Sequence, residues 1–98
     1  MALELGYRHV EGVARRLIAE VMATTDPVRA AEHLGAAETI LRERDARNEL
    51  AKVSVARACL DRAAPDRGLL TQALELFREL GTVDEPVRVE GILRAGRC

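Results

Sequence analysis

The histidines and cysteines are the side chains best suited to catalysis or metal binding, and none of them is spaced for it. His9 and His33 have no second ligand one helical turn away in a His-x-x-x-His or Cys-x-x-Cys arrangement. A nucleophilic Cys59 would need a positioned base and a third orienting group, and neither histidine has such a place in the sequence. We therefore expect no metal site. We expect a small thiol in a helix interface at Cys59, and in Cys98 a terminal thiol that would crosslink two chains if oxidised.

The carboxylates are spaced for helix surfaces rather than for acid–base chemistry. Glu38 with Arg42 and Glu75 with Arg78 lie at helical neighbour spacing, where an ion pair contributes about 0.2 to 0.5 kcal/mol. The seven glycines are scattered along the chain and form no phosphate-binding loop. The sequence thus predicts a protein that is not an enzyme and that needs no cofactor.

Composition excludes several classes of partner. The 98 residues suffice for one domain, and 15 basic against 16 acidic side chains leave a formal net charge of -1. Such a balance provides no electrostatic footprint for nucleic acid or for an anionic membrane. No run of about 18 apolar residues and no signal pattern is present, and two cysteines do not resemble a secreted disulfide framework. We expect a cytoplasmic protein that binds neither membrane nor nucleic acid.

Helix start and stop signals are regular. Asp26-Pro27 offers an N-cap followed by proline at the first helical position, and Pro65-Asp66 breaks the pattern before the next apolar stripe. Gly81 suits a left-handed C-cap. Asp45 or Asn48 would cap the third helix. The apolar spacing predicts helices over about 9–23, 27–44, 45–63, 66–80 and 84–96, with residues 1–6 as the tail of an earlier helix.

The sequence repeats itself over a period of two helices. Aligning Leu34 with Leu70 places Leu41 on Phe77, Arg42 on Arg78 and Glu43 on Glu79, a shift of 36 positions. The expected helix ends near Gly6, Asp45 and Gly81 are separated by 39 and 36 positions. A period of this length, filled by two helices, is typical of an α-solenoid. One helical-repeat domain is expected over 1–98, with pairs at 6–44 and 45–80 and a capping helix at 84–96 over Leu70, Leu74 and Phe77.

At residues 49–60 and 73–81 the chain resembles the tetratricopeptide repeat family. The second stretch, ALELFRELG, is similar to helix ends in the degenerate C-terminal arrays of large bacterial transcriptional activators and adenylate cyclases. The family's Trp-x-x-Leu-Gly-x-x-Tyr opening is absent, and the chain has no Trp. The resemblance implies an all-α fold of about five antiparallel helices, two tetratricopeptide-like pairs and a C-terminal cap, that acts as a protein-interaction scaffold or regulatory module.

The expected binding residues fall into two groups. An array that opens mid-repeat leaves Leu17, Val21 and Met22 incompletely covered, with Tyr7 as an amphipathic contact. We expect this surface to bind a second copy, another protein or a missing upstream segment. The resemblance also places the first helix of each pair on a concave surface, where cations would receive an acidic or C-terminal carboxylate peptide. These cations are Arg8, Arg15, Arg16, Arg47 and Lys52.

Two alternatives remain open at this point. The chain would also fit the C-terminal part of a larger bacterial regulator whose DNA-binding or NTPase regions lie elsewhere. A small helical nucleic-acid binder is the other alternative, and the near-neutral charge argues against it.

Overall fold

The computed structural model describes the backbone of residues 2–98 and the side chains of residues 7–98, and this part of the chain is built from helices alone. The expected all-α class with five helices is confirmed. The helices are α1 (Ala2–Met22), α2 (Pro27–Glu43), α3 (Arg47–Ala58), α4 (Arg67–Leu80) and α5 (Asp84–Ala95). None of the described helices is both long and apolar enough to cross a membrane.

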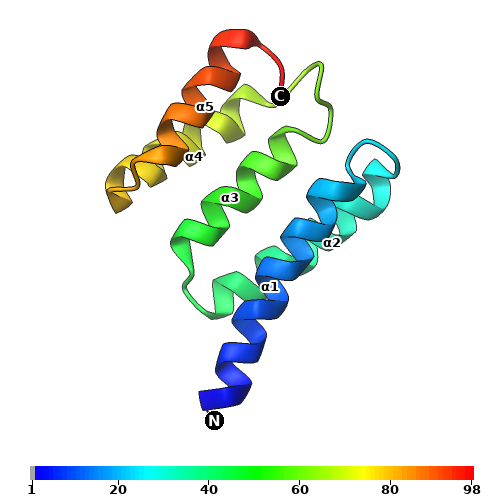
Figure 1. Ribbon diagram of the computed structural model, residues 1–98, viewed down its shortest axis with the longest axis vertical. Coiled ribbons are helices and arrows are strands. Elements are labelled where there is room, and N and C mark those ends of the chain that lie inside the picture. The colour runs from blue at the N-terminus through cyan, green and yellow to red at the C-terminus, as the bar shows by residue number, and fades with distance from the viewer. Residues whose placement is uncertain (1) are drawn as a thin grey trace.

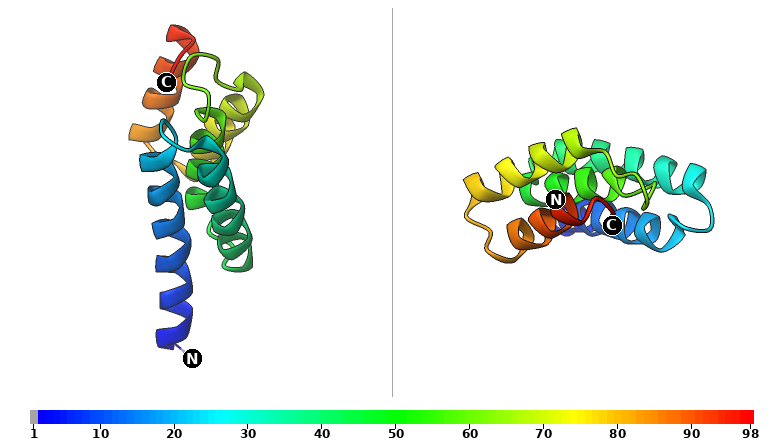
Figure 2. Two further views of the ribbon diagram at one scale, coloured as in Figure 1. Left: turned by 90° about the vertical axis from the view of Figure 1, so that its right-hand side faces the viewer. Right: turned by 90° about the horizontal axis from the view of Figure 1, so that it is seen from above.

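Successive helices pack side by side, and α3 lies at the centre (Figure 1). Seen from above, α1 and α5 lie on one side of α3, while α2 and α4 lie on the other (Figure 2). The first turns of α1 extend beyond the rest of the molecule in both figures. The arrangement therefore leaves one long face of α1 without a neighbouring helix.

Two of the predicted helix starts are confirmed by their caps. The Asp26 carboxylate accepts a hydrogen bond from the Arg29 N–H at 3.1 Å, directly before Pro27. Asp66 accepts one from the Leu69 N–H at 3.1 Å in the same way. Each cap satisfies one of the backbone donors that a helix leaves free at its first turn.

The predicted break at Gly6 is wrong, because α1 runs without interruption from Ala2 to Met22. No proline or capping side chain follows Gly6, and a single glycine inside a helix costs only about 1 kcal/mol. The first six residues are thus part of one long helix. Met1 lies outside the described residues.

The boundaries of the third helix also differ from the prediction. Neither Asp45 nor Asn48 caps α3, whose N-cap is Ala46 without a side-chain hydrogen bond. The helix ends at Ala58 rather than near Ala63, because the Asp61 carboxylate accepts hydrogen bonds from the Ala63 and Ala64 N–H groups. A short acidic side chain that binds the following backbone in this way favours a turn over a helix.

Asp45 ends α2, which confirms the helix end predicted near this residue. Its φ is 52°, its N–H donates to the Arg42 carbonyl at 3.0 Å, and the Ala46 N–H donates to Leu41 at 2.9 Å. Gly81 ends α4 with the same pattern, at φ 76° and with bonds to Arg78 and Phe77. Both are Schellman motifs. They lie 36 residues apart, so the sequence repeat is also a repeat of helix-end geometry.

Two apolar clusters share α3. Val53 joins the cluster under α1 and α2, whose largest members are Leu34 and Leu41. Val55 joins the cluster of α4 and α5, which contains Leu70, Leu74, Phe77 and Val89. The prediction that the last helix covers Leu70, Leu74 and Phe77 is therefore confirmed, with Val89 as the covering residue.

We predict that Asp45→Gly stabilises the protein by about 0.5 to 1 kcal/mol, because glycine adopts the left-handed conformation without the steric cost that an L-residue carries. The reciprocal change, Gly81→Asp, should destabilise by a similar amount. Urea unfolding followed by circular dichroism measures both. Equal effects of the same sign at the two positions would contradict the equivalence of the two helix ends.

Candidate interaction surface

One face of α1 is apolar and open to solvent over four turns. Tyr7, Val10 and Val21 are 71%, 63% and 79% exposed, and Leu17 and Ile18 are each more than two-fifths exposed. Ala14, also exposed, lies in the middle of this face. We call these residues the α1 stripe: Tyr7, Val10, Ala14, Leu17, Ile18 and Val21. Exposed apolar side chains gathered on one helix face are typical of an interaction surface.

The α1 stripe is exposed because α1 packs on its neighbours through its opposite face. Gly12 and Ala19 are buried there, and a Cβ built on Gly12 would lie 2.8 Å from the Leu41 side chain. Helices α1 and α2 approach each other closely at Gly12 because glycine has no side chain. Since residues seven apart lie on the same face of a helix, Gly12 and Ala19 together turn the α1 stripe away from the core.

The structure brings together three of the four apolar residues predicted as partner contacts. Tyr7, Leu17 and Val21 belong to the α1 stripe, whereas Met22 is half-buried and packs against the core cluster of α1, α2 and α3. Val10, Ala14 and Ile18 also belong to the α1 stripe and were not among the predicted contacts. The alternating spacing of three and four from Tyr7 to Val21 would have identified Val10 and Ala14.

Each of the five predicted cations is paired with another side chain of this chain. Arg8 reaches Glu43 on α2 at 3.0 Å, and this hydrogen bond raises the pKa of the Arg8 guanidinium above its ordinary value. Arg15 contacts the His33 Nδ1 at 3.2 Å, and Arg47 bridges to Glu79 on α4 at 3.3 Å. These contacts join neighbouring helices. The binding role of the cations stays a prediction.

Arg16 and Lys52 share one carboxylate between α1 and α3. Arg16 is only 8% exposed and pairs with Glu20 at 3.1 Å and with Glu49 at 3.5 Å. Lys52 reaches the other oxygen of Glu49 at 3.3 Å. A buried guanidinium needs such partners, because an unpaired charge away from water is costly. Arg16 thus fixes α1 against α3.

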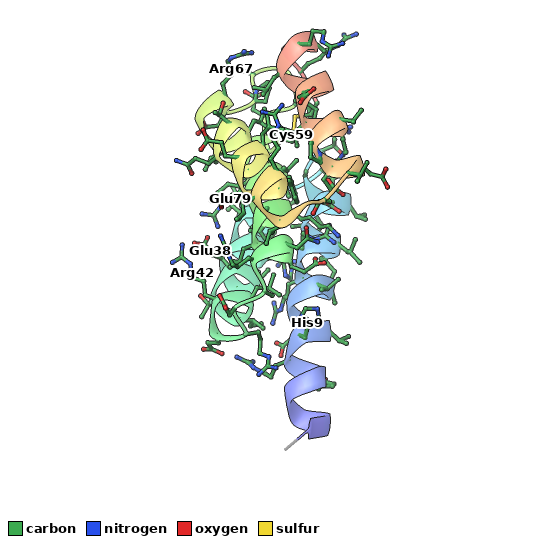
Figure 3. All side chains as sticks on the ribbon, turned by 90° about the vertical axis from the view of Figure 1, so that its left-hand side faces the viewer. His9, Glu38, Arg42, Cys59, Arg67 and Glu79 are labelled. Carbon is green, nitrogen blue, oxygen red and sulfur yellow. A yellow bond between two sulfur atoms is a disulfide. The ribbon has the colours of Figure 1, made fainter. Side chains whose placement is uncertain are left out.

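Ion pairs also join α2 to α3 and α4 to α5. Glu38 on α2 accepts Arg42 at 2.7 Å and Arg57 of α3 at 2.9 Å, and Figure 3 shows Glu38 beside Arg42 on this side. Arg78 of α4 pairs with Glu90 of α5. Ion pairs therefore occur at most of the helix junctions.

We predict that Glu49→Gln destabilises the fold by about 1 to 2 kcal/mol, because a neutral amide replaces the carboxylate that Arg16 and Lys52 share. The matched control is Glu32→Gln at an exposed position of α2, where a change within about 0.5 kcal/mol is expected. Urea unfolding of the two variants measures the difference. Equal stability would show that the Arg16–Glu49 pair does not hold α1 on α3.

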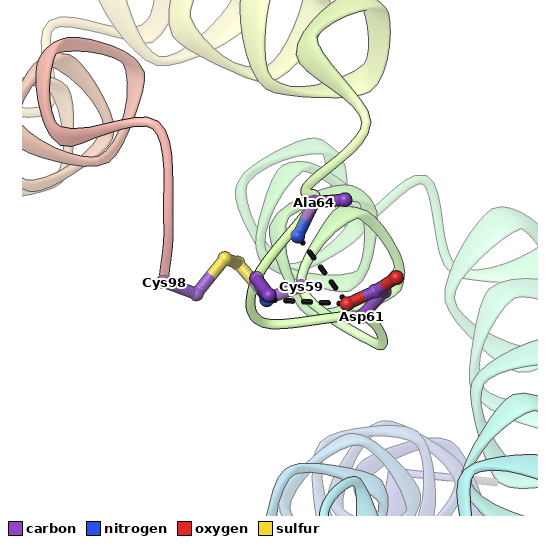
Figure 4. The surroundings of a disulfide bond; sticks show 5 residues. Cys59, Asp61, Ala64 and Cys98 are labelled. Carbon is purple, nitrogen blue, oxygen red and sulfur yellow. Dashed lines mark hydrogen bonds between the residues drawn. A yellow bond between two sulfur atoms is a disulfide. The ribbon is translucent and has the colours of Figure 1, made fainter.

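The two cysteines form a disulfide within the chain, which corrects the expectation of a free thiol at Cys59 and a crosslinking thiol at Cys98. Cys59 is the C-cap of α3, and Cys98 lies just beyond α5 (Figure 4). The Cys98 N–H also donates to the Arg62 carbonyl at 2.9 Å. The terminal segment is thereby fastened to the loop after α3.

No local sequence pattern identified this bond, because Cys59 and Cys98 are 39 positions apart in the sequence. Disulfides persist mainly in oxidising compartments, so the cysteines no longer support the expected cytoplasmic location, which stays a prediction.

A cavity of about 350 Å³ lies beside the disulfide, between α1, α3 and α5. Its apolar lining includes Val55, Ala56 and Ile92, and Glu20, Arg62 and Arg88 lie at its polar side. Among the residues that the structure describes, no group of three metal-binding side chains is present. The cavity is therefore an open groove of mixed polarity.

We predict that reduction lowers the stability by about 2 to 4 kcal/mol, because the bond closes a long loop and limits the unfolded chain. The melting temperature should fall by roughly 10 °C or more. Cys98→Ser should reproduce the effect and should remove any further response to reductant. Thermal unfolding with and without a phosphine reductant measures this, and an unchanged melting temperature in Cys98→Ser would contradict it.

Comparison with known proteins yielded no match: no family model, no curated protein and no solved structure is similar to this chain.

Proposed function

We propose that this protein is a non-enzymatic interaction module of the tetratricopeptide type that binds another protein through the α1 stripe. The observation that carries the proposal is the exposure of five large apolar side chains on one helix, led by Val21, Tyr7 and Val10. An apolar face of this length costs solubility and contributes nothing to the core. Binding a partner gives it a role.

The repeat-type assignment is supported by the 36-residue equivalence of Asp45 and Gly81. Each residue ends the second helix of a pair with a left-handed conformation and a Schellman motif. The α5 helix supplies the cap that a short array needs at its end, with Val89 against Leu70 and Phe77. These features support stacked helix pairs as the building principle.

The binding mode we propose is the packing of an amphipathic helix along the α1 stripe. A partner helix would present apolar side chains at three- and four-residue spacing, matching the spacing from Tyr7 to Val21. Glu11 and Arg15 lie along one border of the stripe and would set the orientation of the partner.

The test is selection from a displayed library of amphipathic helical peptides with the intact, oxidised protein as bait. Selected peptides should lose at least about tenfold in affinity for a Val10→Asp variant, because the complex would bury an unpaired carboxylate. The matched control is Val28→Asp on α2, a valine that is 71% exposed outside the α1 stripe.

Circular dichroism should show that both variants are folded, because both valines are exposed. Peptides that bind the wild type and the Val10→Asp variant equally would contradict the proposed surface. A library that yields no specific binder would contradict the helix-binding mode.

A further inference from the structure

We propose that the occupant of the α1 stripe is the α1 stripe of a second copy, packed antiparallel about a two-fold axis beside Ala14. This inference rests on the proposed function, since it names the partner of the same surface. It commits to one symmetric arrangement in which each chain contributes the same residues.

The spacing of the stripe suits pairing with another long helix. Exposed positions 7, 10, 14, 17 and 21 alternate in steps of three and four, which is the spacing of the contact positions in two-stranded coiled coils. The stripe is straight over these turns because its members share one face of a single uninterrupted helix. The α1 stripe can therefore contact a second copy without any rearrangement of the monomer.

The order of side-chain sizes along the stripe suits an antiparallel partner. With the axis at Ala14, Tyr7 of one copy lies opposite Val21 of the other, and Val10 lies opposite Ile18. Leu17 lies opposite Glu11, so it contacts the aliphatic part of that side chain. The largest side chain therefore meets a smaller one at each end. Small alanines meet at the centre, where they allow the two backbones to approach closely.

The border of the stripe carries charges of both signs. Glu11 and Arg15 lie along one edge of α1, within 3.9 Å of each other. In an antiparallel pair this edge faces the same edge running the opposite way. With the axis at Ala14, the two Arg15 side chains lie close to the axis, and Glu11 of each copy lies beside Arg15 of both copies. Two carboxylates and two guanidinium groups therefore form one cluster without net charge.

The area available is sufficient for a reversible dimer. The exposed parts of the stripe side chains come to roughly 500 Å² per chain, so two copies would bury about 1,000 Å², the lower bound for a specific interface. We therefore expect a dimer that dissociates on dilution through the micromolar range rather than a permanent one.

The first experiment is sedimentation of the oxidised protein over a concentration series. The wild type and the Val28→Asp control should shift from monomer to dimer as concentration rises, whereas Val10→Asp should remain a monomer. A wild type that is monomeric into the millimolar range would overturn the inference. A Val10→Asp variant that dimerises like the wild type would also overturn it.

Crosslinking then determines the direction of the helices. Ala14→Cys should form a disulfide-linked dimer under mild oxidation, because the two-fold axis brings the two copies of position 14 together. Val21→Cys should not, because in the antiparallel pair it faces Tyr7 of the other copy. Efficient crosslinking of both variants would indicate a parallel pair and would contradict the proposal. Peptide mapping should show the Cys59–Cys98 bond intact in each variant.

The two proposals fail in distinguishable ways. A strictly monomeric protein whose selected peptides still depend on Val10 would refute the self-pairing and would leave the interaction module standing. Selected peptides that bind independently of Val10 would refute the module at this surface.

Discussion

The burial of α3 on two opposite sides is the constraint on which the rest of the structure depends. Val53 faces the cluster under α1 and α2, while Val55 faces the cluster under α4 and α5. Neither helix pair could bury its apolar face without this shared helix, because a single pair exposes one side to water. A chain of fewer than 100 residues buries little apolar surface in any one core. Here two small apolar clusters, joined through α3, together stabilise the fold in place of one larger core.

Many of the charged side chains in this protein form ion pairs between helices. Arg8, Arg16 and Arg47 each pair with a carboxylate of another helix, as do Arg57 and Arg78. Exposed pairs contribute little individually, but their positions favour one register of the stacked helices. The pair of Arg16 and Glu49 is the most buried of them. The cysteine bond adds a covalent tie at the end of α3.

These interactions leave one apolar surface, the α1 stripe, exposed to solvent. Core packing uses the Gly12 and Ala19 face of α1, and the flanking Arg8 and Arg16 turn toward α2 and α3. The apolar side of α1 is then the remaining side, and nothing else in the described chain covers it. The self-complementary order of its side chains suggests how two copies would remove it from water.

The sequence determined the helical class, the number of helices and the position of most boundaries, because these depend on local chemistry. Helix caps such as Asp26-Pro27, Asp66 and Gly81 act on the backbone within a few residues. Their effect can therefore be predicted from the sequence without knowledge of tertiary contacts. The 36-residue repeat was also visible in the sequence. In the structure it corresponds to two helix ends of the same geometry, at Asp45 and Gly81.

Tertiary structure decided which apolar and charged residues are available to a partner. Leu17 and Leu41 are both leucines on amphipathic helices, yet the first is exposed and the second is fully buried. Only the close approach at Gly12 distinguishes them. Arg16 is equally ambiguous in sequence, and its burial follows from a carboxylate 33 residues away. The bond of Cys59 to Cys98 depends on how α5 packs on α4, beside the end of α3. Such long-range juxtapositions arise from packing, and local residue patterns carry too little information about packing to specify them.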